Sequence, residues 1–426
     1  MLTHTTFIKN IEKSILENNR KEYVYIYYFD FVEFKLINHY YGISGGNILL
    51  GKVETYLKQL PQIVAYEHFF SDQFAFAVRT ENIHSDINLV TSYSQLFSPF
   101  LSELQNEYAK CNLQTYCGVC LVEENEVAKA LENASMAWRK AKERRTPGIT
   151  VYSAAMKAEM LQIYEIERIA TMALQRNDFA FFLQPKVELR TGKVVGAEAL
   201  MRYIDGKNGV SPEQFLAVME KNGSVIELDR LILRKTCEYM QKRMAVAGSV
   251  VCTSINISRM HAEFPDAVQQ LHAITQEYQI PAKLIQFELT ETFSTDQLSG
   301  VKALCSQLSD LGYSIAIDDF GAGYAGINVI QELKFDVLKL DRKFLVSEEP
   351  LRKKNETIMP GIVHMLQKLG AISLCEGVET EEQCRYLMRI GCDQAQGFYF
   401  SKPVPPDQFY EAYDRNAGHY QVPKIC

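Results

Sequence analysis

The sequence has no apolar run long enough to form a membrane-spanning helix. It contains no stretch of 18 or more consecutive apolar residues, whereas about 20 are needed to cross the hydrocarbon core of a bilayer. The N-terminal segment MLTHTTFIKNIEKSILENN carries charges throughout and lacks the apolar core of a secretory signal. We therefore expect a cytoplasmic protein that has no membrane partner.

Positive charge is also in short supply. The chain has 45 Lys and Arg residues against 52 Asp and Glu residues, which gives a formal net charge of −7. Because nucleic acids bind to basic surfaces, we expect no nucleic-acid partner. The balance still allows a small phosphate ligand that is held by metal ions and a few local cations.

The ten cysteines form no disulfide or metal-binding framework. Cys117 and Cys120 make up a CxxC, but they lie in the apolar stretch TYCGVCLV, which is typical of a β-strand. Positions i and i+3 of a strand point to opposite faces, so a metal or redox role is not expected. Reduced cytosolic thiols are the better interpretation.

Low-complexity tracts and long Pro/Gly/Ser linkers are absent, so we infer the domains from periodicity. Residues 1–155 alternate β-prone and helical runs, which predicts an α/β unit. In chain order we expect an N-terminal helix, a strand at 23–34, a helix at 47–60, a strand at 74–78, a helix at 89–110, a strand at 115–122, a helix at 126–144 and a strand at 149–152.

Residues 156–173 predict a connecting helix, and a second unit follows at 174–415 before a tail at 416–426. Eight β-prone runs separated by mostly helical segments predict a TIM-like βα-barrel of about 240 residues in this second unit. The expected barrel strands are 179–185, 194–202, 250–258, 284–291, 314–320, 337–341, 371–378 and 394–400.

Polar residues gather on one face of several of these strands. Side chains alternate along a strand, so residues two apart lie together: Glu198 with Leu200 and Arg202, Asn256 with Ser254 and Ser258, Glu288 with Thr290, and Lys339 with Asp341. Burying so many carboxylates is prohibitive unless cations accompany them. Since the C-terminal mouth of a barrel is where such residues serve catalysis, these positions indicate an active site.

Two adjacent acids, Asp318 and Asp319, indicate a metal site. Neighbouring strand residues diverge, so both acids reach one site only if the strand ends there, and Gly321 and Gly323 permit such a turn. Oxygen ligands suit hard ions such as Mg²⁺ or Mn²⁺, and the cluster has no His to favour zinc. Several carboxylates can hold two ions, which suits phosphoester cleavage.

The same residues also have structural interpretations. Taken alone, Arg202 is explained by an ion pair with a neighbouring acid, and Lys339 and Asp341 by an internal ion pair. Glu291 and Glu379 are consistent with helix-entry or structural acids, and we favour that interpretation for Glu379. For the acid cluster as a whole a structural explanation is weak, because buried charge is costly.

Seven segments, in order and spacing, resemble the motif series of the EAL family of cyclic di-GMP phosphodiesterases. They are QPKVELRTGKVVGAEALMR, SINIS, FELTET, IAIDDFGAGYAG, LKLDR, CEGVET and QAQGFYFSKP. The resemblance covers the whole second unit, and it implies hydrolysis of cyclic di-GMP to linear pGpG with two Mg²⁺ or Mn²⁺ ions per site. By family analogy alone it also implies a homodimer.

The resemblance implies a role for each matching position. The first metal would have four ligands: Glu198, Asn256, Glu288 and Asp318. The second would have Asp318 as a bridge, Asp319, and Glu376 directly or through water. Catalysis would involve Glu198 and Glu376, with the attacking water positioned or activated by Lys339 and Gln396. Substrate contacts would come from Gln184, Leu200, Arg202 and Asp341, and Glu291 would stabilise the loop after the fifth strand.

That loop departs from the family pattern. The family usually has DDFGTGYSS where this chain has DDFGAGYAG, so Ala322, Ala325 and Gly326 replace hydroxylated residues. The expected metal ligands are unchanged, but three hydroxyl groups able to order the loop are lost. We expect an effect on loop ordering, dimer coupling and catalytic rate more than on metal binding.

The first unit resembles a GGDEF domain, which is the diguanylate cyclase family. FDFVEFKLINHYYGISGGNILL matches the nucleotide-binding stretch of that family, and ALENASMAWRKAKERR matches its C-terminal helix. The resemblance implies that Asp30 and Asp72 match its metal-binding acids and that Asn38 matches its guanine contact. The GGDEF signature itself is degraded to FSDQF at residues 70–74.

The degraded signature predicts that the first unit makes no cyclic di-GMP. Glycines let the backbone approach phosphates closely, and Phe70 obstructs that approach, while Gln73 removes a carboxylate. Val32 and Asn47 stand where further acids are usual, and residues 61–64 replace the product-binding RxxD motif. A GTP-binding regulatory module and a structural, dimerising module remain as alternatives, and we favour the second.

Three functions remain for the whole chain. The first is an active phosphodiesterase, the second a catalytically slow cyclic di-GMP receptor that signals through protein–protein contacts, and the third a protein-interaction scaffold. Degenerate receptors of the family typically lose metal-binding acids. This chain keeps them all, which favours the enzyme.

Overall fold

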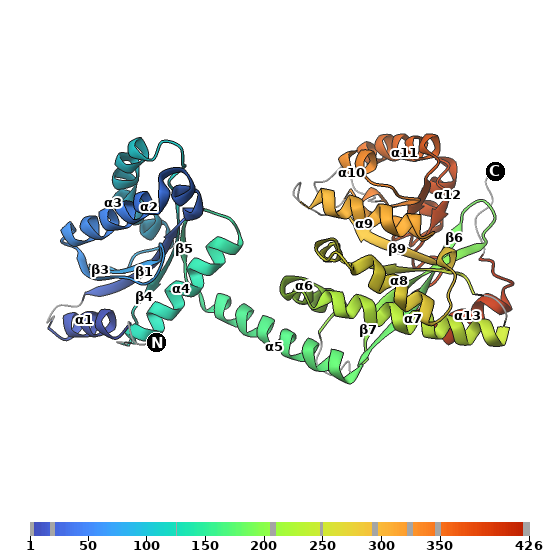
Figure 1. The fold of residues 1–426 in the computed structure, drawn as a ribbon, viewed down its shortest axis with the longest axis horizontal. Coiled ribbons are helices and arrows are strands. Elements are labelled where there is room, and N and C mark those ends of the chain that lie inside the picture. The colour runs from blue at the N-terminus through green and yellow to red at the C-terminus, as the bar shows by residue number, and fades with distance from the viewer. Residues whose placement is uncertain are drawn as a thin grey trace. The chain divides into compact units, whose positions relative to one another are not determined.

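The computed structural model describes residues 4–17, 22–124, 126–204, 210–247, 250–291, 297–321, 327–345 and 351–420. The chain divides into two compact units, Met1–Tyr164 and Glu165–Cys426, and helix α5, Ala154–Arg176, begins in the first and ends in the second (Figure 1). Across the described ranges no helix is both long and apolar enough to cross a bilayer. The altered loop positions Ala322, Ala325 and Gly326 lie outside these ranges.

The first unit is a five-stranded sheet with helices on both faces, which confirms the predicted α/β fold. Its strands pair in the order β2-β3-β1-β4-β5; β5 runs parallel to β4, and the other neighbouring pairs are antiparallel. The elements are α1 (His4–Leu16), β1 (Tyr23–Phe31), α2 (Phe34–Gln59), β2 (Ile63–His68), β3 (Phe74–Thr80), α3 (Asp86–Glu107), β4 (Thr115–Leu121), α4 (Val127–Glu143) and β5 (Gly148–Val151).

Two elements of this unit differ from the prediction. The sequence does not predict β2, because only Ala65 of its six residues is buried and such an edge strand shows no apolar alternation. Helix α2 begins at Phe34, well before the predicted start. Its two halves meet at a kink at Gly42, with φ 72° and ψ 166°, and the kink interrupts the helical period.

Different helices cover the two faces of the sheet, with α2 and α3 on one side and α1 and α4 on the other (Figure 1). Cys117 packs with Phe29 on the α2–α3 side, whereas Cys120 packs with Ala130 on the α1–α4 side. The predicted divergence of the CxxC pair is confirmed. All nine cysteines in the described part of the chain are free thiols.

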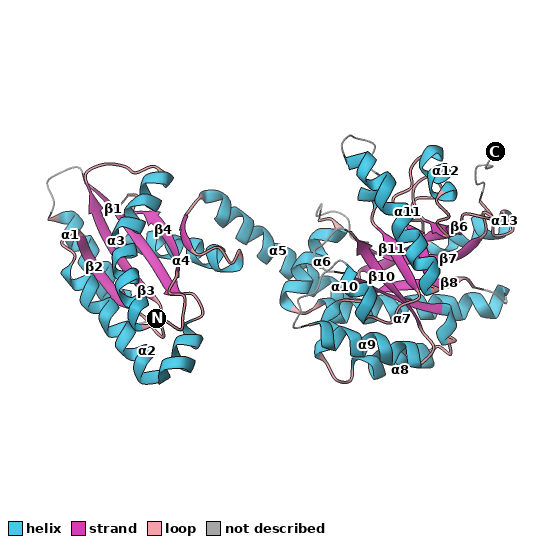
Figure 2. Ribbon diagram, turned by 90° about the horizontal axis from the view of Figure 1, so that it is seen from above, coloured by secondary structure: helices cyan, strands magenta, loops and turns pink. Residues whose placement is uncertain are grey.

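The second unit is a closed eight-stranded barrel surrounded by helices (Figure 2), which confirms the predicted TIM-like architecture. Its strands are β6 (Phe179–Glu188), β7 (Val194–Tyr203), β8 (Cys252–Asn256), β9 (Ile285–Thr290), β10 (Ser314–Phe320), β11 (Val337–Leu340), β12 (Ile372–Cys375) and β13 (Gln394–Ala395). Its helices are α6 (Pro212–Asn222), α7 (Val225–Ala247), α8 (Ala267–Glu277), α9 (Leu298–Asp310), α10 (Ile327–Glu332), α11 (Leu351–Leu369), α12 (Glu381–Arg389) and α13 (Pro406–Arg415).

The barrel departs from a purely parallel one at β6. This strand is antiparallel to both of its neighbours, β7 and β13, because the connection from β6 to β7 is a short hairpin and not a helical crossover. The last strand is also shorter than predicted and ends at Ala395. Beyond it the backbone of Gly397 approaches Val378 so closely that a Cβ would lie 2.2 Å from the Val378 carbonyl oxygen.

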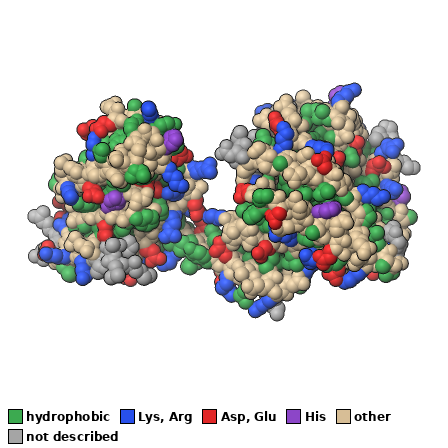
Figure 3. Space-filling view, viewed as in Figure 1, with side chains coloured by type: hydrophobic (Ala, Val, Ile, Leu, Met, Phe, Trp, Pro, Cys, Tyr) green, Lys and Arg blue, Asp and Glu red, His purple; other side chains and the backbone are tan. Residues whose placement is uncertain are grey.

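Charges are mixed on the surface of both units. Figure 3 shows acidic and basic side chains interspersed on the visible face of each unit. Lys302 and Glu332 form a typical exposed pair, with 2.6 Å between Nζ and Oε2. Pairs of this kind contribute at most about 1 kcal/mol to stability, so the fold depends on its cores and on the buried charges described below.

Candidate active site

A buried lysine lies at the centre of four barrel carboxylates. Lys339 of β11 is fully buried. Its Nζ lies 2.7 Å from Glu288 Oε2, 2.7 Å from Glu376 Oε1, 3.1 Å from Asp318 Oδ1 and 3.4 Å from Glu198 Oε2. Alternation along the strands predicts inward positions for Glu198, Glu288 and Lys339, and the structure brings these three together with Asp318 and Glu376.

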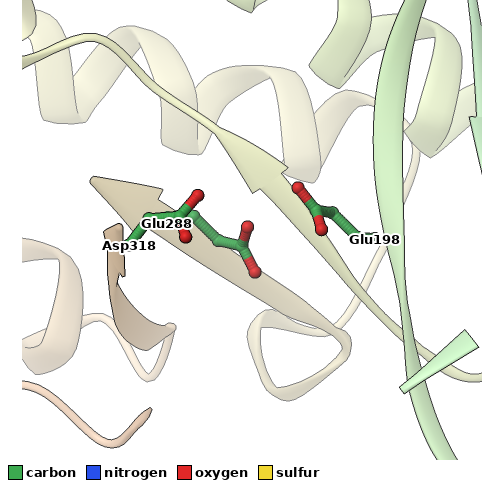
Figure 4. A group of neighbouring side chains, drawn as sticks. All are labelled: Glu198, Glu288 and Asp318. Atoms are coloured by element: carbon green, nitrogen blue, oxygen red, sulfur yellow. The ribbon is translucent and has the colours of Figure 1, made fainter. Parts of the chain in front are cut away.

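The acids form two overlapping groups that could hold cations. In each group the ligand oxygens lie within 4.8 Å of one another: Glu198, Glu288 and Asp318 in the first, and Asp318, Asp319 and Glu376 in the second. Figure 4 shows the first group converging from three strands. Every donor in both groups is an oxygen atom, and such donor sets fit hard ions like Mg²⁺ or Mn²⁺.

Asp318 and Asp319 reach the same group because β10 bulges just before it ends. The strand finishes at Phe320, as predicted, and its pairing with β11 shifts register between Ile317 and Phe320. Asp319 takes a left-handed conformation with φ 57°, which Asp adopts more readily than bulky residues. This local twist turns two adjacent side chains toward one site.

Burial and crowding shift the pKa values of these groups in different directions. Burial, reinforced by neighbouring carboxylates, raises the pKa of Glu198, and burial also raises that of Asp318. Burial raises the pKa of Glu376 to about 8. Burial alone would raise the pKa of Glu288 as well, but two lysines outweigh it and hold that pKa well below its usual range. Burial opposes the charge of Lys339, yet the surrounding carboxylates raise its pKa well above the usual value.

The second of these lysines, Lys186 of β6, is a residue that the sequence analysis missed. Its Nζ donates to Glu288 Oε1 at 2.6 Å and to Gln286 Oε1 at 2.7 Å, and the side chain is buried. Glu288 is thus held by one lysine on each carboxylate oxygen. A signal was present in the sequence, because Lys186 lies two residues after Gln184 and shares its strand face.

Two glutamines connect the acids to a cavity. Gln396 Nε2 donates to Glu198 Oε2 at 2.6 Å and to Gln184 Oε1 at 2.9 Å, and Asn256 Nδ2 donates to Glu198 Oε1 at 2.9 Å. Gln396 Oε1 is buried and has no hydrogen-bond partner among the described residues. A buried acceptor of this kind is suited to bind a water molecule.

The cavity has a volume of about 280 Å³. Its lining contains six of the predicted site residues: Gln184, Glu198, Leu200, Asp318, Glu376 and Gln396. It also contains residues to which the sequence analysis gave no site role: Arg342, Gly377, Glu379, Gly397 and Phe398. The cavity therefore lies directly beside the acid cluster.

Two predicted substrate contacts lie outside this lining and have local partners. The half-buried Arg202 guanidinium lies 5.4 Å from the centre of the Phe182 ring, and its Nη1 donates to the Met201 carbonyl oxygen at 2.7 Å. Asp341 Oδ1 accepts a hydrogen bond from the Lys343 N–H at 2.8 Å. Lys339 pairs with the acid cluster and not with Asp341, so the alternative of an internal Lys339–Asp341 pair is not observed.

Glu291 ties β9 to the turn that follows β10. Its carboxylate is fully buried, and Oε1 accepts a hydrogen bond from the Gly321 N–H at 3.2 Å. Its own N–H donates to the Asp318 carbonyl oxygen at 3.0 Å. Glu291 therefore contacts Gly321, the last described residue before the loop, and the loop-stabilising role that the resemblance implies stays a prediction.

In the first unit, two side chains of α4 hold the carboxylate of Asp30. Trp138 Nε1 donates to Asp30 Oδ1 at 2.8 Å, and the Lys142 ammonium contacts Oδ2. Asp72 accepts a hydrogen bond from the Phe31 N–H at 3.0 Å, and burial raises its pKa. Both acids that the resemblance assigns to metal binding are therefore buried and bonded within the unit.

The FSDQF segment forms the turn between β2 and β3. Phe70 is 67 % exposed, and Ser71 is left-handed with φ 55°. Gln73 Oε1 accepts a hydrogen bond from the Tyr28 hydroxyl at 2.7 Å. Asn38, the expected guanine contact, packs against Gly46, where a Cβ would lie 2.0 Å from Asn38 Oδ1.

Two family models match the chain and divide it as the two units do. Residues 167–403 match the model described as EAL domain, and residues 2–147 match the one described as Diguanylate cyclase, GGDEF domain. The two matches follow one another in the order that the sequence motifs predict.

Similar proteins match this chain along most of its length. Signaling protein YkoW of Bacillus subtilis is 27 % identical over 417 residues, which are 96 % of this chain and 50 % of YkoW. Cyclic di-GMP phosphodiesterase NbdA of Pseudomonas aeruginosa is 27 % identical over 433 residues, 97 % of this chain and 53 % of NbdA. The chain thus spans about half the length of these relatives. A solved structure described as PaMucR Phosphodiesterase, c-di-GMP complex, is 28 % identical, with a TM-score of 0.53, and covers 57 % of this chain and 99 % of that one.

Proposed function

Because this chain belongs to the EAL domain family, we propose that its second unit hydrolyses cyclic di-GMP to linear pGpG with two Mg²⁺ or Mn²⁺ ions. The observation that carries the proposal is the convergence of Glu198, Glu288, Asp318, Asp319 and Glu376 on two shared oxygen-lined groups. The likeness to NbdA and to the MucR phosphodiesterase structure supports the choice of substrate.

Different side chains would bind the metal ions, position the attacking water and contact the substrate. Glu198, Asn256, Glu288 and Asp318 would hold one ion, and Asp318, Asp319 and Glu376 the other. Bound ions of this kind generate hydroxide from water and offset charge in the transition state of phosphoester cleavage. The pKa of Lys339 lies well above its usual value, so this side chain stays protonated and donates hydrogen bonds to the acid cluster.

The remaining residues position water and substrate. Gln396 Oε1 is free to accept a hydrogen bond from the attacking water, while its Nε2 stays on Glu198. Gln184 and Leu200 line the cavity that receives the nucleotide. Arg202 would reach a substrate phosphate by exchanging its hydrogen bond to the Met201 carbonyl oxygen for one to the phosphate.

The first unit would not synthesise cyclic di-GMP. Support comes from Asp30, whose carboxylate is already bonded to Trp138 and Lys142, and from Phe70 at the turn where the signature has glycine. A calorimetric titration with GTP and Mg²⁺ separates the two alternative roles. A heat signal favours the regulatory nucleotide site, and a flat titration favours the structural, dimerising module.

The test of the main proposal is chromatography of products after incubation with cyclic di-GMP and Mg²⁺ or Mn²⁺. We expect pGpG from the parent chain and none from Glu198→Gln, which keeps the side-chain shape but removes a ligand charge. Glu332→Gln is the matched control, because Glu332 forms only an exposed ion pair. Binding of cyclic di-GMP without any pGpG would support the receptor alternative, and full activity of Glu198→Gln would refute the site.

A further inference from the structure

The first unit contains a second cavity that is separate from the GGDEF-type residues. Its volume is about 340 Å³, and its lining includes Tyr25, Leu121, Asn133, Val151 and Ala154. It lies at the end of the sheet where β1 begins and where β4 and β5 finish. Tyr25 and Asp30 are five residues apart on β1, which is roughly 16 Å along a strand. The cavity is therefore not part of the Asp30 site.

An unsatisfied polar atom points to a ligand in this cavity. Asn133 is 7 % exposed, and its Oδ1 has no hydrogen-bond partner among the described residues. Its side chain does interact with the Cys120 thiol, so the amide is held in place. A buried acceptor without a donor is unfavourable, and a ligand that donates an N–H to it would remove that cost.

The walls of the cavity favour a flat apolar body. The rings of Tyr25 and His84 stack with 6.0 Å between their centres and an angle of 22° between their planes, and both residues line the cavity. Leu89, Val119 and Ala130 are buried apolar residues that complete the lining. A planar ring fits such a surface better than a flexible polar chain.

The mouth of the cavity selects against anions. Its exposed charges are three carboxylates, Asp86, Glu123 and Glu126, against one ammonium, Lys129. Lys129 is already paired with Glu126, with 2.5 Å between Nζ and Oε2. The remaining negative charge attracts cations and repels phosphates, in contrast to the chemistry expected at Asp30 and Asp72.

From these features we propose that the first unit binds a small planar aromatic cation that carries an N–H donor. The N–H donates to Asn133 Oδ1, the ring packs between the aromatic and aliphatic walls, and the positive charge faces the carboxylates at the mouth. Ala154, the first residue of α5, lines the same cavity. The ligand thus contacts the point where the chain leaves the first unit toward the second (Figure 1).

Benzamidine and benzoate provide a matched pair of probes for the full chain. They share a ring, but benzamidine is a cation with N–H donors and benzoate is an anion without them. Titrations by ligand-observed NMR, with diamagnetic Mg²⁺ present to fill the acid cluster of the second unit, should show benzamidine binding with a dissociation constant on the order of 1 mM, as expected for so small a fragment. Benzoate should bind at least about tenfold more weakly, and equal binding of the two would overturn the proposal.

The Asn133→Leu variant tests the named acceptor. Loss of one hydrogen bond to a charged donor should weaken benzamidine binding about tenfold, whereas Asn106→Leu, at an exposed position of α3, should leave it unchanged. Fluorescence of Trp138, the only tryptophan, reports whether the unit is folded. Should Asn133→Leu not fold, cross-linking of the parent chain with a diazirine-labelled benzamidine is the deciding measurement. Cross-links on the cavity-lining residues of β1, α3, β4, α4 or β5 support the site, and cross-links confined to residues that do not line the cavity refute it.

Discussion

Replacing Lys339 by methionine should destabilise the metal-free second unit more than any exposed charge change. The substitution keeps the length of the side chain but removes the ammonium that lies within 3.4 Å of four carboxylates. Breaking a buried ion pair by removing one partner costs about 3–5 kcal/mol. That loss is a large part of the roughly 5–15 kcal/mol that holds a domain folded, and it corresponds to a fall in melting temperature of roughly 6–20 °C.

Protonation limits the loss in a way that can be measured. Without the lysine the buried acids can take up protons, and burial already raises the pKa of Glu198 and Asp318. The difference in melting temperature between parent and Lys339→Met should therefore be smaller at low pH, where the acids are neutral, than at high pH, where they are charged. Mn²⁺ should also reduce the difference, because it supplies positive charge to the same oxygens.

The assay is thermal unfolding in EDTA, followed at the same time by circular dichroism and by tryptophan fluorescence. The only tryptophan, Trp138, lies in the first unit. The unfolding transition seen by its fluorescence is therefore an internal control, and Lys339→Met should not shift it. Lys302→Met is the matched control, and its exposed pair with Glu332 should contribute less than about 1 kcal/mol. A second-unit transition in Lys339→Met that coincides with that of Lys302→Met would refute the argument.

Three further changes follow from the geometry. Asp319→Val should unfold at a lower urea concentration than Asp319→Gly. Both variants lose the carboxylate, but only Val is strained at φ 57°, and that strain costs about 1–2 kcal/mol. Equal unfolding midpoints would contradict the left-handed conformation. Gly397→Ala should lower the free energy of unfolding by about 1–3 kcal/mol, since its Cβ would lie 2.2 Å from the Val378 oxygen. Gly361→Ala has nothing within 4 Å of its Cβ and should raise the free energy of unfolding by up to about 1 kcal/mol in the interior of α11. Unfolding midpoints that shift in the same direction for both variants would count against this packing. The pKa of Glu376 is raised to about 8, so at neutral pH its carboxyl is mostly protonated and a metal must displace that proton; calorimetry in buffers of different ionisation enthalpy should show proton release, and Mn²⁺ affinity should rise toward pH 8. A pH-independent affinity would contradict the raised pKa.

The sequence predicts the inward faces of the barrel well, because a strand has a fixed period of two. Glu198, Glu288 and Lys339 were assigned to the interior from alternation alone, and all three are buried in contact with one another. The same rule places Lys186 on the inward face of β6, but a single lysine gives no indication of the acid that it meets on another strand.

Local conformation and strand ends were harder to predict. The convergence of Asp318 and Asp319 depends on one left-handed residue and one shift of register, and neither leaves a periodic trace in the sequence. The chain beyond β13 includes the close approach of Gly397 to Val378, a tertiary contact that local sequence does not reveal. Alternation therefore identifies the residues of the site, whereas the distances between them depend on contacts that form only in the folded barrel.

The order of charges along the chain has a consequence for folding during synthesis. Lys186 is made first, Glu198, Glu288 and Asp318 follow, and Lys339 emerges only afterwards. At synthesis rates of about 5–20 residues per second, the nascent chain contains Glu198 for roughly 7–28 s before the Lys339 ammonium is made. During that interval the carboxylates of β7, β9 and β10 lack the Lys339 ammonium, so the ribosome-bound part of the barrel should stay open and hydrated at least until β11 has been made, and it closes only when β13 pairs with β6.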